Sequence, residues 1–355
     1  MSRIIEEDVR CILSKDLPWK KLENCSILIT GASGMLASYL VFTIGQYMQD
    51  HSDSGISLYL AVRNRTKAEK RFGALLEVPN LFVVSWDGES DLDADLKPDY
   101  IIHAASIADS SMYLTNPVET IVPNVIGTWK LLELARRHPV KGFLFFSSAS
   151  AYGKVTGKEV IREEDSGYLQ PQAVRSCYGE SKRMGENLCA SYASEYGVPA
   201  FAVRISHTYG PTMNLRGDSR VFAEFVRNIV DHEDIVMKSD GRAKRAFCYI
   251  SDATEAFLRI LLCGVPGQVY NMCNDEAFVS IAELAQKMTL LFPERKLKVC
   301  RIERVAGDTY SENKNANSDV LATEKLRALG WKPTVTIEEG FRRTVMSFEK
   351  EMSEL

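Results

Sequence analysis

Tyr178 and Lys182 are the two residues whose types and spacing point most clearly to chemistry. They stand four positions apart in the segment Tyr178-Gly179-Glu180-Ser181-Lys182, and residues at this spacing share one face of a helix. An ammonium group beside a phenol favours the phenolate and lowers a pKa that is ordinarily about 10, so Tyr178 could take a proton from a substrate hydroxyl near neutral pH. The same spacing also occurs on ordinary helix surfaces, so the pair alone does not indicate a catalytic site and a second feature of the sequence is needed.

A cluster of hydroxyl side chains precedes this pair in the sequence. The run Phe146-Ser147-Ser148-Ala149-Ser150-Ala151-Tyr152-Gly153 closes an apolar segment that is typical of a strand. Ser148 or Ser150 at the end of such a strand could orient and polarise the substrate oxygen that Tyr178 would deprotonate. Small hydroxyl residues also favour ordinary turns, which is the alternative.

A glycine-rich turn follows the first apolar run. The segment Gly31-Ala32-Ser33-Gly34-Met35-Leu36-Ala37 has the pattern Gly-x-x-Gly-x-x-Ala at the start of a helical stretch. Gly31 would permit the tight turn, Gly34 would let a pyrophosphate approach the backbone, and Ala37 would let helix and strand pack closely. An ordinary tight turn is the alternative. The expected contacts of a dinucleotide here are Gly31, Ser33, Gly34, Met35 and Leu36.

The residues after the second and third apolar runs bear on which dinucleotide fits. An acidic residue after the second run would bind the adenosine ribose hydroxyls of NAD, but the sequence has Val62-Arg63-Asn64 there. Arg63, with Asn64 beside it, favours the 2′-phosphate of NADP; the alternative is a basic, solvated loop with NAD held by other contacts. Asp87 is placed to accept from the adenine amino group or to form a surface turn.

Short apolar runs alternate with helical patterns through the first two thirds of the chain. The runs lack polar alternation, as strands buried on both faces of a parallel sheet do, so we expect a doubly wound, Rossmann-type α/β fold. The predicted strands are Ile27–Thr30, Leu58–Val62, Leu81–Ser85, Tyr100–Ala104, Phe143–Ser147 and Ala200–Ile205. The predicted helices are Met35–Gln49, Lys67–Leu76, Val118–Arg137 and Tyr178–Glu195.

The pattern changes after Tyr209-Gly210-Pro211. Helices there mix with short strand-like pieces such as Gln268–Met272, which indicates a smaller α+β substrate-binding lobe at the carboxyl edge of the sheet, where ligands of such sheets bind. The predicted units are a helical extension over 1–21 that ends near Pro18, a dinucleotide-binding domain over 22–206 to which 245–265 return, and a lobe formed mainly by 207–355.

Composition excludes several classes of protein. The 355 residues are 45% hydrophobic and 25% charged, with a net charge of −4, which is unlike a disordered chain and gives no electrostatic footprint for nucleic acid. The apolar stretches are shorter than the ~20 residues of a membrane span, and the charged start is unlike a signal peptide. The eight Cys and five His show no metal-ligand spacing. We expect a cytoplasmic protein without a metal, nucleic-acid or membrane partner.

Taken together and in this order, the motifs resemble the extended short-chain dehydrogenase/reductases of the nucleotide-sugar epimerase/dehydratase group. Within that group the chain is most similar to UDP-glucuronate decarboxylases, and the resemblance covers nearly the whole chain after Leu22. The matching fragments are Gly31 to Gly34, Ile102 to Ser106, Asn116-Pro117 with Asn124, Ser147 to Gly153, Arg175 to Lys182, Arg204 to Pro211, Arg245-Ala246-Phe247, Ser251-Asp252 and Asn271.

The resemblance implies a role for each matching residue of the reaction centre. Tyr178 would deprotonate the C4 hydroxyl of the sugar while a hydride passes to the nicotinamide. Lys182 would hold the nicotinamide ribose, and Ser148 would be the hydroxyl partner. The expected further contacts of the cofactor are Ala104, Ala105, Ser106 and Asn124.

The resemblance also implies how substrate and partner would bind. Arg220 and Arg245 would contact the diphosphate of the sugar nucleotide, a task for which the planar guanidinium is suited. Ser150 and His207 would lie beside the substrate. The helical patterns over 118–137 and 178–195 would form the interface of a homodimer.

Three positions depart from the family pattern. Ala149 and Ser150 stand where dehydratases and decarboxylases of the group carry acidic residues, which argues against dehydration and against the usual decarboxylase mechanism. His207 replaces a common Asn and could donate to the diphosphate, act as a second acid or base, or simply line the cleft. Arg63 replaces a common Asp.

We therefore expect transient C4 oxidation of a nucleotide-linked sugar by NAD or NADP, ending in epimerisation or in a UDP-glucuronate-decarboxylase-like conversion. One alternative is an NADPH-dependent reductase of a keto-sugar nucleotide, which Arg63 and the missing acids favour. The other is a non-catalytic dinucleotide-binding sensor.

Overall fold

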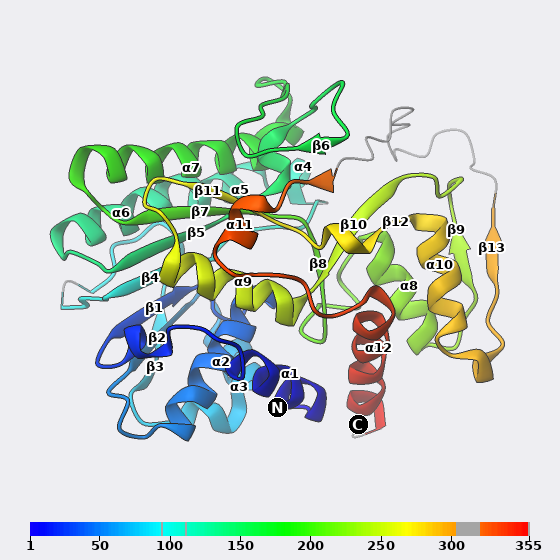
Figure 1. Ribbon diagram of the computed structural model, residues 1–355, viewed down its shortest axis with the longest axis horizontal. Coiled ribbons are helices and arrows are strands. Elements are labelled where there is room, and N and C mark those ends of the chain that lie inside the picture. Colours follow the sequence, from blue (N-terminus) through cyan, green and yellow to red (C-terminus); the bar gives the residue numbers. More distant parts are fainter. Residues whose placement is uncertain (94, 111, 303–319, 354–355) are drawn as a thin grey trace.

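A seven-stranded parallel sheet forms the centre of the molecule, with strand order β11-β7-β5-β4-β1-β2-β3 (Figure 1). The computed structural model describes residues 1–93, 95–110, 112–302 and 320–353. The strands are β1 (Ser26–Thr30), β2 (Ser57–Val62), β3 (Leu81–Ser85), β4 (Tyr100–His103), β5 (Gly142–Ser148), β7 (Ala200–Ile205) and β11 (Val269–Met272). Every neighbouring pair among them runs parallel, so the predicted Rossmann-type fold is confirmed.

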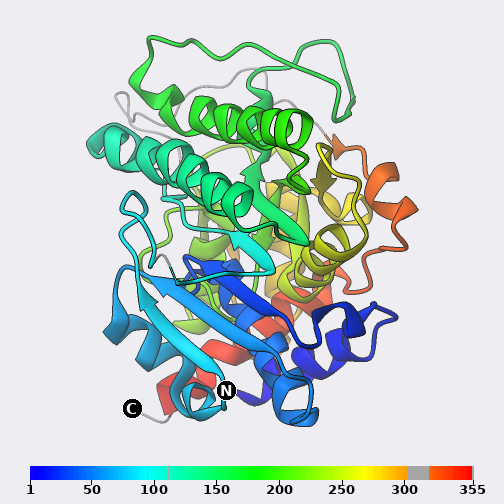
Figure 2. The same cartoon turned by 90° about the vertical axis from the view of Figure 1, so that its left-hand side faces the viewer.

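Helices cover both faces of this sheet (Figure 2). One face carries α2 (Met35–Asp50), α3 (Arg65–Phe72) and α9 (Ile250–Cys263); the other carries α6 (Thr128–Arg137) and α7 (Cys177–Tyr196). As a result β5 is buried at every position. A strand covered on both faces needs apolar residues on both, which is why the uninterrupted apolar runs predicted these strands.

The predicted helix over Val118–Arg137 is interrupted in the structure. The segment forms α5 (Pro117–Val122), a π-helical turn (η3, Pro123–Gly127) and then α6. Pro123 has no N–H to donate, which disturbs a regular helix, and its carbonyl oxygen pairs with Nε2 of His103 at 2.9 Å. The π turn, a feature that often marks functional sites, places Asn124 in the interior.

A smaller lobe lies beyond the carboxyl edge of the sheet, at the right of Figure 1. It contains a three-stranded sheet of order β12-β10-β8 and the pair β13-β9. Its elements are β8 (His207–Tyr209), β9 (Ile235–Met237), β10 (Lys244–Tyr249), β12 (Phe278–Ser280), β13 (Val299–Arg301), α8 (Val221–Val230), α10 (Ile281–Leu290) and α12 (Ile337–Ser353). The other short strands and α-helices are β6 (Val160–Ile161), β14 (Val320–Leu321), α4 (Met112–Thr115) and α11 (Glu324–Ala328).

Two further segments differ from their prediction. The piece Gln268–Met272, expected in the lobe, is β11, because Val269–Met272 pair with β7 and extend the main sheet. The N-terminal helix α1 (Arg3–Leu13) ends well before Pro18, and a short 3-10 turn follows it at Trp19–Leu22. Within the described ranges, no helix has the length and apolar character needed to cross a membrane.

Candidate active site

Ser148, Tyr178 and Lys182 meet at the carboxyl edge of the central sheet. Ser148 is the last residue of β5, and Tyr178 and Lys182 occupy successive turns at the start of α7. The Ser148 side chain lies close enough to the Tyr178 hydroxyl to lower the pKa of the phenol, and Nζ of Lys182 lies 5.6 Å from the centre of the Tyr178 ring. All three side chains are buried. The structure therefore brings the three predicted catalytic residues together.

Burial dominates the protonation of Tyr178. It raises the pKa of the phenol above its usual value, and the Ser148 hydroxyl, the charge of Arg220 and the Tyr113 hydroxyl act against that rise. The lowering expected from Lys182 does not appear among these influences. The cation that reaches the phenol in this arrangement is Arg220.

Lys182 is directed into the sheet. Its Nζ donates to the carbonyl oxygen of Phe146 at 2.6 Å and lies 4.9 Å from the centre of the Phe145 ring. Burial lowers the pKa of Lys182 to about 7, and the charge of Glu186 acts in the opposite direction. At neutral pH such an amine is only partly protonated, which explains its weak influence on the neighbouring phenol.

A buried ion pair supports Lys182 from the next turn of α7. Both carboxylate oxygens of Glu186 accept from Arg204 of β7, at 2.9 and 2.7 Å, and Glu186 also accepts from the Ser147 hydroxyl. Arg204 donates in addition to the carbonyl oxygen of Glu163 at 2.9 Å. The network ties α7 to β5 and β7, so the helix that carries the predicted catalytic pair is fixed against the sheet.

Arg183 holds the hydroxyl-rich loop after β5. Its Nε donates to the Ala151 carbonyl oxygen at 2.6 Å and its Nη2 to that of Tyr152 at 3.0 Å. Within the loop, Oγ of Ser148 accepts from the backbone N–H of Ser150 at 3.1 Å. Ser150 itself is exposed, so the structure places Ser148, and not Ser150, against Tyr178.

The glycine turn lies directly against the end of β4. Gly31 has a φ of +63°, and a Cβ atom there would come within 2.7 Å of Cα of Ala105. Ala105 is held in place because its N–H donates to Oγ1 of Thr30 at 3.3 Å. Gly34 is the N-cap of α2, and no described side chain caps that helix, so its first backbone N–H groups remain available to an anion.

The surroundings of this turn fit a dinucleotide. Oγ of Ser106 and Oδ1 of Asn124 are buried and have no hydrogen-bond partner within the described part of the chain, and buried acceptors of this kind normally have a partner. The Asn124 amide is fixed by Nδ2, which donates to the Ser181 hydroxyl at 3.0 Å. The other predicted contacts are partly buried around the turn: Ser33, Met35, Leu36 and Ala104.

Basic residues gather after β2. Arg63 is exposed and Asn64 is the N-cap of α3, with Oδ1 accepting from the backbone N–H of Lys67 at 2.8 Å. Burial, followed by the charges of Arg71 and Arg63, lowers the pKa of Lys67. The two arginines therefore lie close enough to Lys67 for their charges to disfavour its protonated form. Arg71 also donates to the Thr212 carbonyl oxygen at 3.1 Å. The cluster is suited to an anion.

Asp87 forms a surface turn. Its Oδ1 accepts from the backbone N–H groups of Ser90 and Glu89, at 2.8 and 2.9 Å. These bonds lower the pKa of Asp87 to about 2. An adenine amino group would therefore have to use Oδ2.

His207, Arg220 and Arg245 are grouped at the edge of the lobe. His207 of β8 pairs in register with Phe247 of β10, the strand that also carries Arg245. Burial, with the charges of Arg245 and Arg220, lowers the pKa of His207 to about 3. These influences favour the neutral imidazole at pH 7, and a neutral imidazole can donate one N–H to a phosphate oxygen. Arg220 is ion-paired with Asp218 at 2.5 Å.

Tyr113 in α4 is a site residue that the sequence did not predict. Its ring stacks on that of Tyr178, with centroids 4.7 Å apart and planes within 9° of each other. Tyr113 stands in a segment without periodicity or motif, and the sequence signal nearest to it is Asn116-Pro117. Its proximity to Tyr178 depends on the path of the loop after β4.

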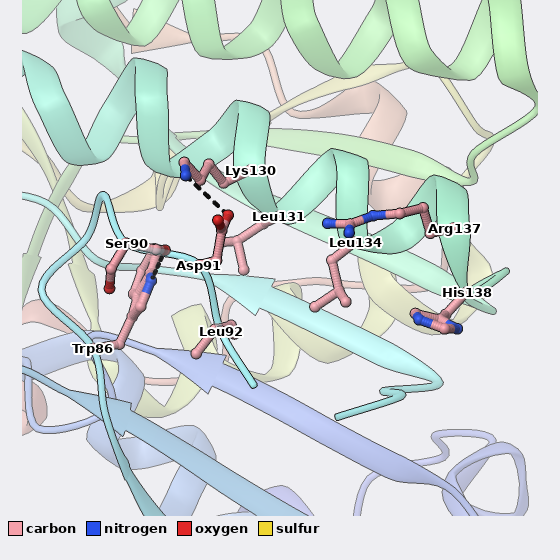
Figure 3. Close-up of a pocket in the computed structure, with 9 residues that line it drawn as sticks. All are labelled: Trp86, Ser90, Asp91, Leu92, Lys130, Leu131, Leu134, Arg137 and His138. Carbon is pink, nitrogen blue, oxygen red and sulfur yellow. Dashed lines mark hydrogen bonds and ion pairs between the residues drawn. The ribbon is translucent and has the colours of Figure 1, made fainter. Parts of the chain in front are cut away.

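A cavity of about 250 Å³ lies elsewhere, between the loop after β3 and α6 (Figure 3). Its polar lining includes Lys130, which is ion-paired with Asp91 at 2.9 Å, together with Arg137 and His138. None of the predicted site residues lines it. In the described ranges no three His, Cys, Asp or Glu side chains are grouped as a metal site would require.

Hydride-transfer enzymes of the short-chain dehydrogenase type combine a sheet of this kind with a Ser–Tyr–Lys group at its carboxyl edge. Comparison with protein families agrees, since the sequence model of the NAD dependent epimerase/dehydratase family matches residues 27–273. The chain belongs to this family.

Similar proteins include UDP-glucuronic acid decarboxylases. UDP-glucuronic acid decarboxylase 6 of Arabidopsis thaliana is 30% identical over 321 residues, which is 89% of this chain and 87% of that protein. UDP-glucuronic acid decarboxylase 1 of Xenopus tropicalis is 29% identical over 330 residues, 92% of this chain and 72% of that protein.

Solved structures share the fold. The UDP-glucose 4-epimerase of Thermotoga maritima superposes with a TM-score of 0.77 at 22% identity, over 92% of this chain and 99% of that one. The dTDP-glucose 4,6-dehydratase of Bacillus anthracis superposes with a TM-score of 0.74 at 20% identity, over 93% and 98% of the two chains.

Proposed function

We propose that this protein transiently oxidises the C4 hydroxyl of a nucleotide-linked sugar and releases an epimerised or decarboxylated product. The observation that carries the proposal is the buried Ser148–Tyr178–Lys182 group at the sheet edge that also holds the Gly31–Gly34 turn. Relatives that are UDP-glucuronic acid decarboxylases support a UDP-sugar as the substrate.

The residues of the chain would handle the proton of the sugar hydroxyl. A bound nicotinamide dinucleotide would supply the hydride acceptor for C4. Ser148 would hydrogen-bond the C4 oxygen, and Tyr178 would take its proton and later return it. For this the pKa of Tyr178 must fall below its raised value, and the cation that already acts to lower it is Arg220.

The residues after β5 disfavour loss of water, and they also disfavour a decarboxylation that takes its proton from an acid at these positions. Dehydration needs an acid to protonate the departing hydroxyl group, and the positions expected to supply it are Ala149 and Ser150. The buried Glu186 is engaged by Arg204. A 4-keto uronate is a β-keto acid, so the step that releases CO₂ needs no acid: the C5–C6 bond breaks with its electrons moving toward the C4 ketone and leaves an enolate. C5 must then take a proton, which solvent water would supply because Ala149 and Ser150 carry no acidic group.

The basic cluster after β2 supports NADP over NAD. Arg63 and Lys67 make no ion pair with a carboxylate in the described part of the chain. A 2′-phosphate would offset the repulsion by Arg71 and Arg63 that, after burial, lowers the pKa of Lys67. The same cluster favours a second candidate, net reduction of a keto-sugar nucleotide by NADPH. An enzyme that restores its cofactor in each turnover retains it through purification, whereas a reductase must exchange it.

The test is incubation with UDP-, GDP-, CDP- and dTDP-sugars, with products identified by mass spectrometry and NMR. An unchanged mass with an inverted centre indicates epimerisation, and loss of the mass of CO₂ indicates decarboxylation. Tyr178→Phe is the control: it should lower turnover by about 10²–10⁴-fold and retain cofactor binding. Undiminished turnover by this variant would contradict the proposal.

We also propose a cytoplasmic homodimer. None of the eight cysteines forms a disulfide, as is usual in a reducing compartment. The outer face of α5, α6 and α7 exposes large apolar side chains, among them Val118, Trp129 and Met184, and Figure 2 shows α6 and α7 side by side at the edge of the molecule. A second copy of the chain would cover this face.

A further inference from the structure

The helix α1 carries a buried carboxylate that contacts three other parts of the molecule. Asp8 is 3% exposed. Its Oδ2 accepts from the hydroxyls of Tyr39 and Tyr249, at 2.8 and 2.7 Å. Its Oδ1 accepts from Nε of Arg343 at 3.0 Å and pairs with Nη2 of the same guanidinium at 2.9 Å. Every bond joins elements that are distant in the sequence.

The partners of Asp8 belong to the two halves of the candidate site. Tyr39 lies one turn after Met35 in α2, the helix that begins at the glycine turn. Tyr249 ends β10, the strand that carries Arg245 and pairs with the strand of His207. Asp8 therefore ties the cofactor half directly to the substrate half.

The third partner extends the connection to the C-terminal helix. Arg343 lies in α12 and also donates to the carbonyl oxygen of Ile4 at 3.1 Å. Two residues earlier, Phe341 stacks on Tyr209 of β8 at 3.9 Å between centroids. In Figure 1 α1 and α12 lie at the same end of the molecule, below the junction of sheet and lobe.

On this basis we propose that α1 acts as a clasp and that Asp8 is a positioning residue, which holds β10 and α12 at a fixed distance from α2 and so sets the distance between cofactor and sugar nucleotide. The inference rests on the proposed function, because it takes β10 to carry a substrate contact at Arg245. No residue of α1 would touch substrate or cofactor.

The chemistry of the contact makes the clasp specific. The Asp8 carboxylate accepts three hydrogen bonds, from two phenols and Nε of a guanidinium, and its Oδ1 also forms an ion pair with Nη2 of that guanidinium, so the three donor side chains converge on one point. An amide at the same position keeps one acceptor oxygen but places an N–H₂ donor against other donors. Asp8→Asn should thus release the lobe without removing the apolar contacts of α1.

The experiment compares Asp8→Asn with Val9→Ala, a variant that weakens α1 at a neighbouring, fully buried apolar position and leaves the carboxylate intact. Tyr249→Phe removes the lobe contact alone and keeps the test available if Asp8→Asn folds poorly. Hydrogen exchange is followed in β10 and α12, and the affinities for UDP and for NADP are measured by calorimetry at temperatures equally far below each melting point.

We expect Asp8→Asn and Tyr249→Phe to accelerate hydrogen exchange in β10 and to weaken UDP binding about tenfold, while the affinity for NADP stays unchanged. Val9→Ala should match the wild type in the exchange of β10 and in the affinity for UDP. Equal effects of Val9→Ala and Asp8→Asn, or unchanged exchange in β10, would overturn the clasp. Hydrogen exchange in β10 tests the clasp even if the protein binds no UDP. Failure of the clasp can therefore be distinguished from failure of the proposed substrate class.

Discussion

Lys182 lies in the candidate active site, and the burial of its ammonium group lowers the stability of the folded protein. Its side chain is 2% exposed, and its pKa of about 7 means that burial disfavours the ammonium form. The carbonyl of Phe146 and the charge of Glu186 offset part of that cost. A lysine kept in such surroundings is typical of a functional site, where perturbed pKa values gather.

This cost predicts an unusual dependence of stability on pH. Because the folded pKa lies below the ordinary value of 10.5, the unfolded chain binds more protons between pH 7 and 10.5, and Lys182 makes the free energy of unfolding rise with pH in that window. In Lys182→Met this contribution is absent. The stability of the wild type relative to the variant should therefore increase by roughly 2–4 kcal/mol between pH 7 and 10, measured by urea unfolding of both. Parallel pH curves would show that Lys182 titrates normally.

Arg63 predicts the cofactor preference. A guanidinium–phosphate contact contributes about 1.5–3 kcal/mol, so Arg63→Asp should lower the ratio of kcat/KM for NADP to that for NAD by about tenfold or more. Arg65→Asp makes the same change of charge at an exposed residue of α3 that is already paired with Glu69, and should leave the ratio nearly unchanged. Equal responses of the two variants would reduce the role of Arg63 to general surface charge.

At the scale of single residues, short-range sequence patterns were sufficient to predict some residues of the candidate site but not others. Tyr178, Lys182 and Ser148 could be predicted to lie together because helix periodicity and the end of one strand determine their positions. Tyr113 could not, because its stacking on Tyr178 depends on a loop. The direction in which Lys182 points also depends on the carbonyl of Phe146, which no sequence pattern reveals.

At the scale of elements, α7 depends on close approach to the sheet. Gly185 lies between Lys182 and Glu186 on the inner side of the helix, and a Cβ atom there would come within 2.3 Å of the Phe145 ring. That ring is buried and also lies beneath Nζ of Lys182. The glycine therefore determines how deeply the helix and its predicted catalytic residues sit.

Gly185→Ala should lower both stability and turnover. Alanine improves helix propensity by about 1 kcal/mol, but overpacking against Phe145 costs about 1–3 kcal/mol and displaces Lys182. Ser191→Ala, at an exposed position of the same helix, isolates the propensity effect and should leave the melting temperature unchanged or slightly higher. A stabilised and fully active Gly185→Ala would show that α7 can shift freely.

The elements themselves were predicted well where the pattern was local. Six of the seven strands of the central sheet were predicted because each contains a continuous apolar run. The break at Pro123–Gly127 was missed because the apolar periodicity continues across it, while the cause is a proline whose carbonyl is taken by His103. β11 was assigned to the lobe because its neighbour in the sheet, β7, is far away in the sequence.

At the scale of the whole molecule, the face formed by α5, α6 and α7 remains without a partner in the single chain. Val118 is 64% and Trp129 46% exposed, and patches of such side chains usually mark interaction surfaces. α7 also carries Tyr178 and Lys182 on its inner side, so a partner that covers its outer side would press the predicted catalytic helix onto the sheet.

Trp129→Glu should therefore convert a dimer into a monomer, because a buried unpaired charge at an interface costs several kcal/mol. Light scattering after gel filtration at micromolar concentration measures the mass directly. Leu290→Glu introduces the same charge at an apolar residue of α10 that is 76% exposed and distant from this face, and it should keep the dimer. A monomeric wild type, or a Trp129→Glu variant that stays dimeric, would exclude the α5–α7 face as the interface.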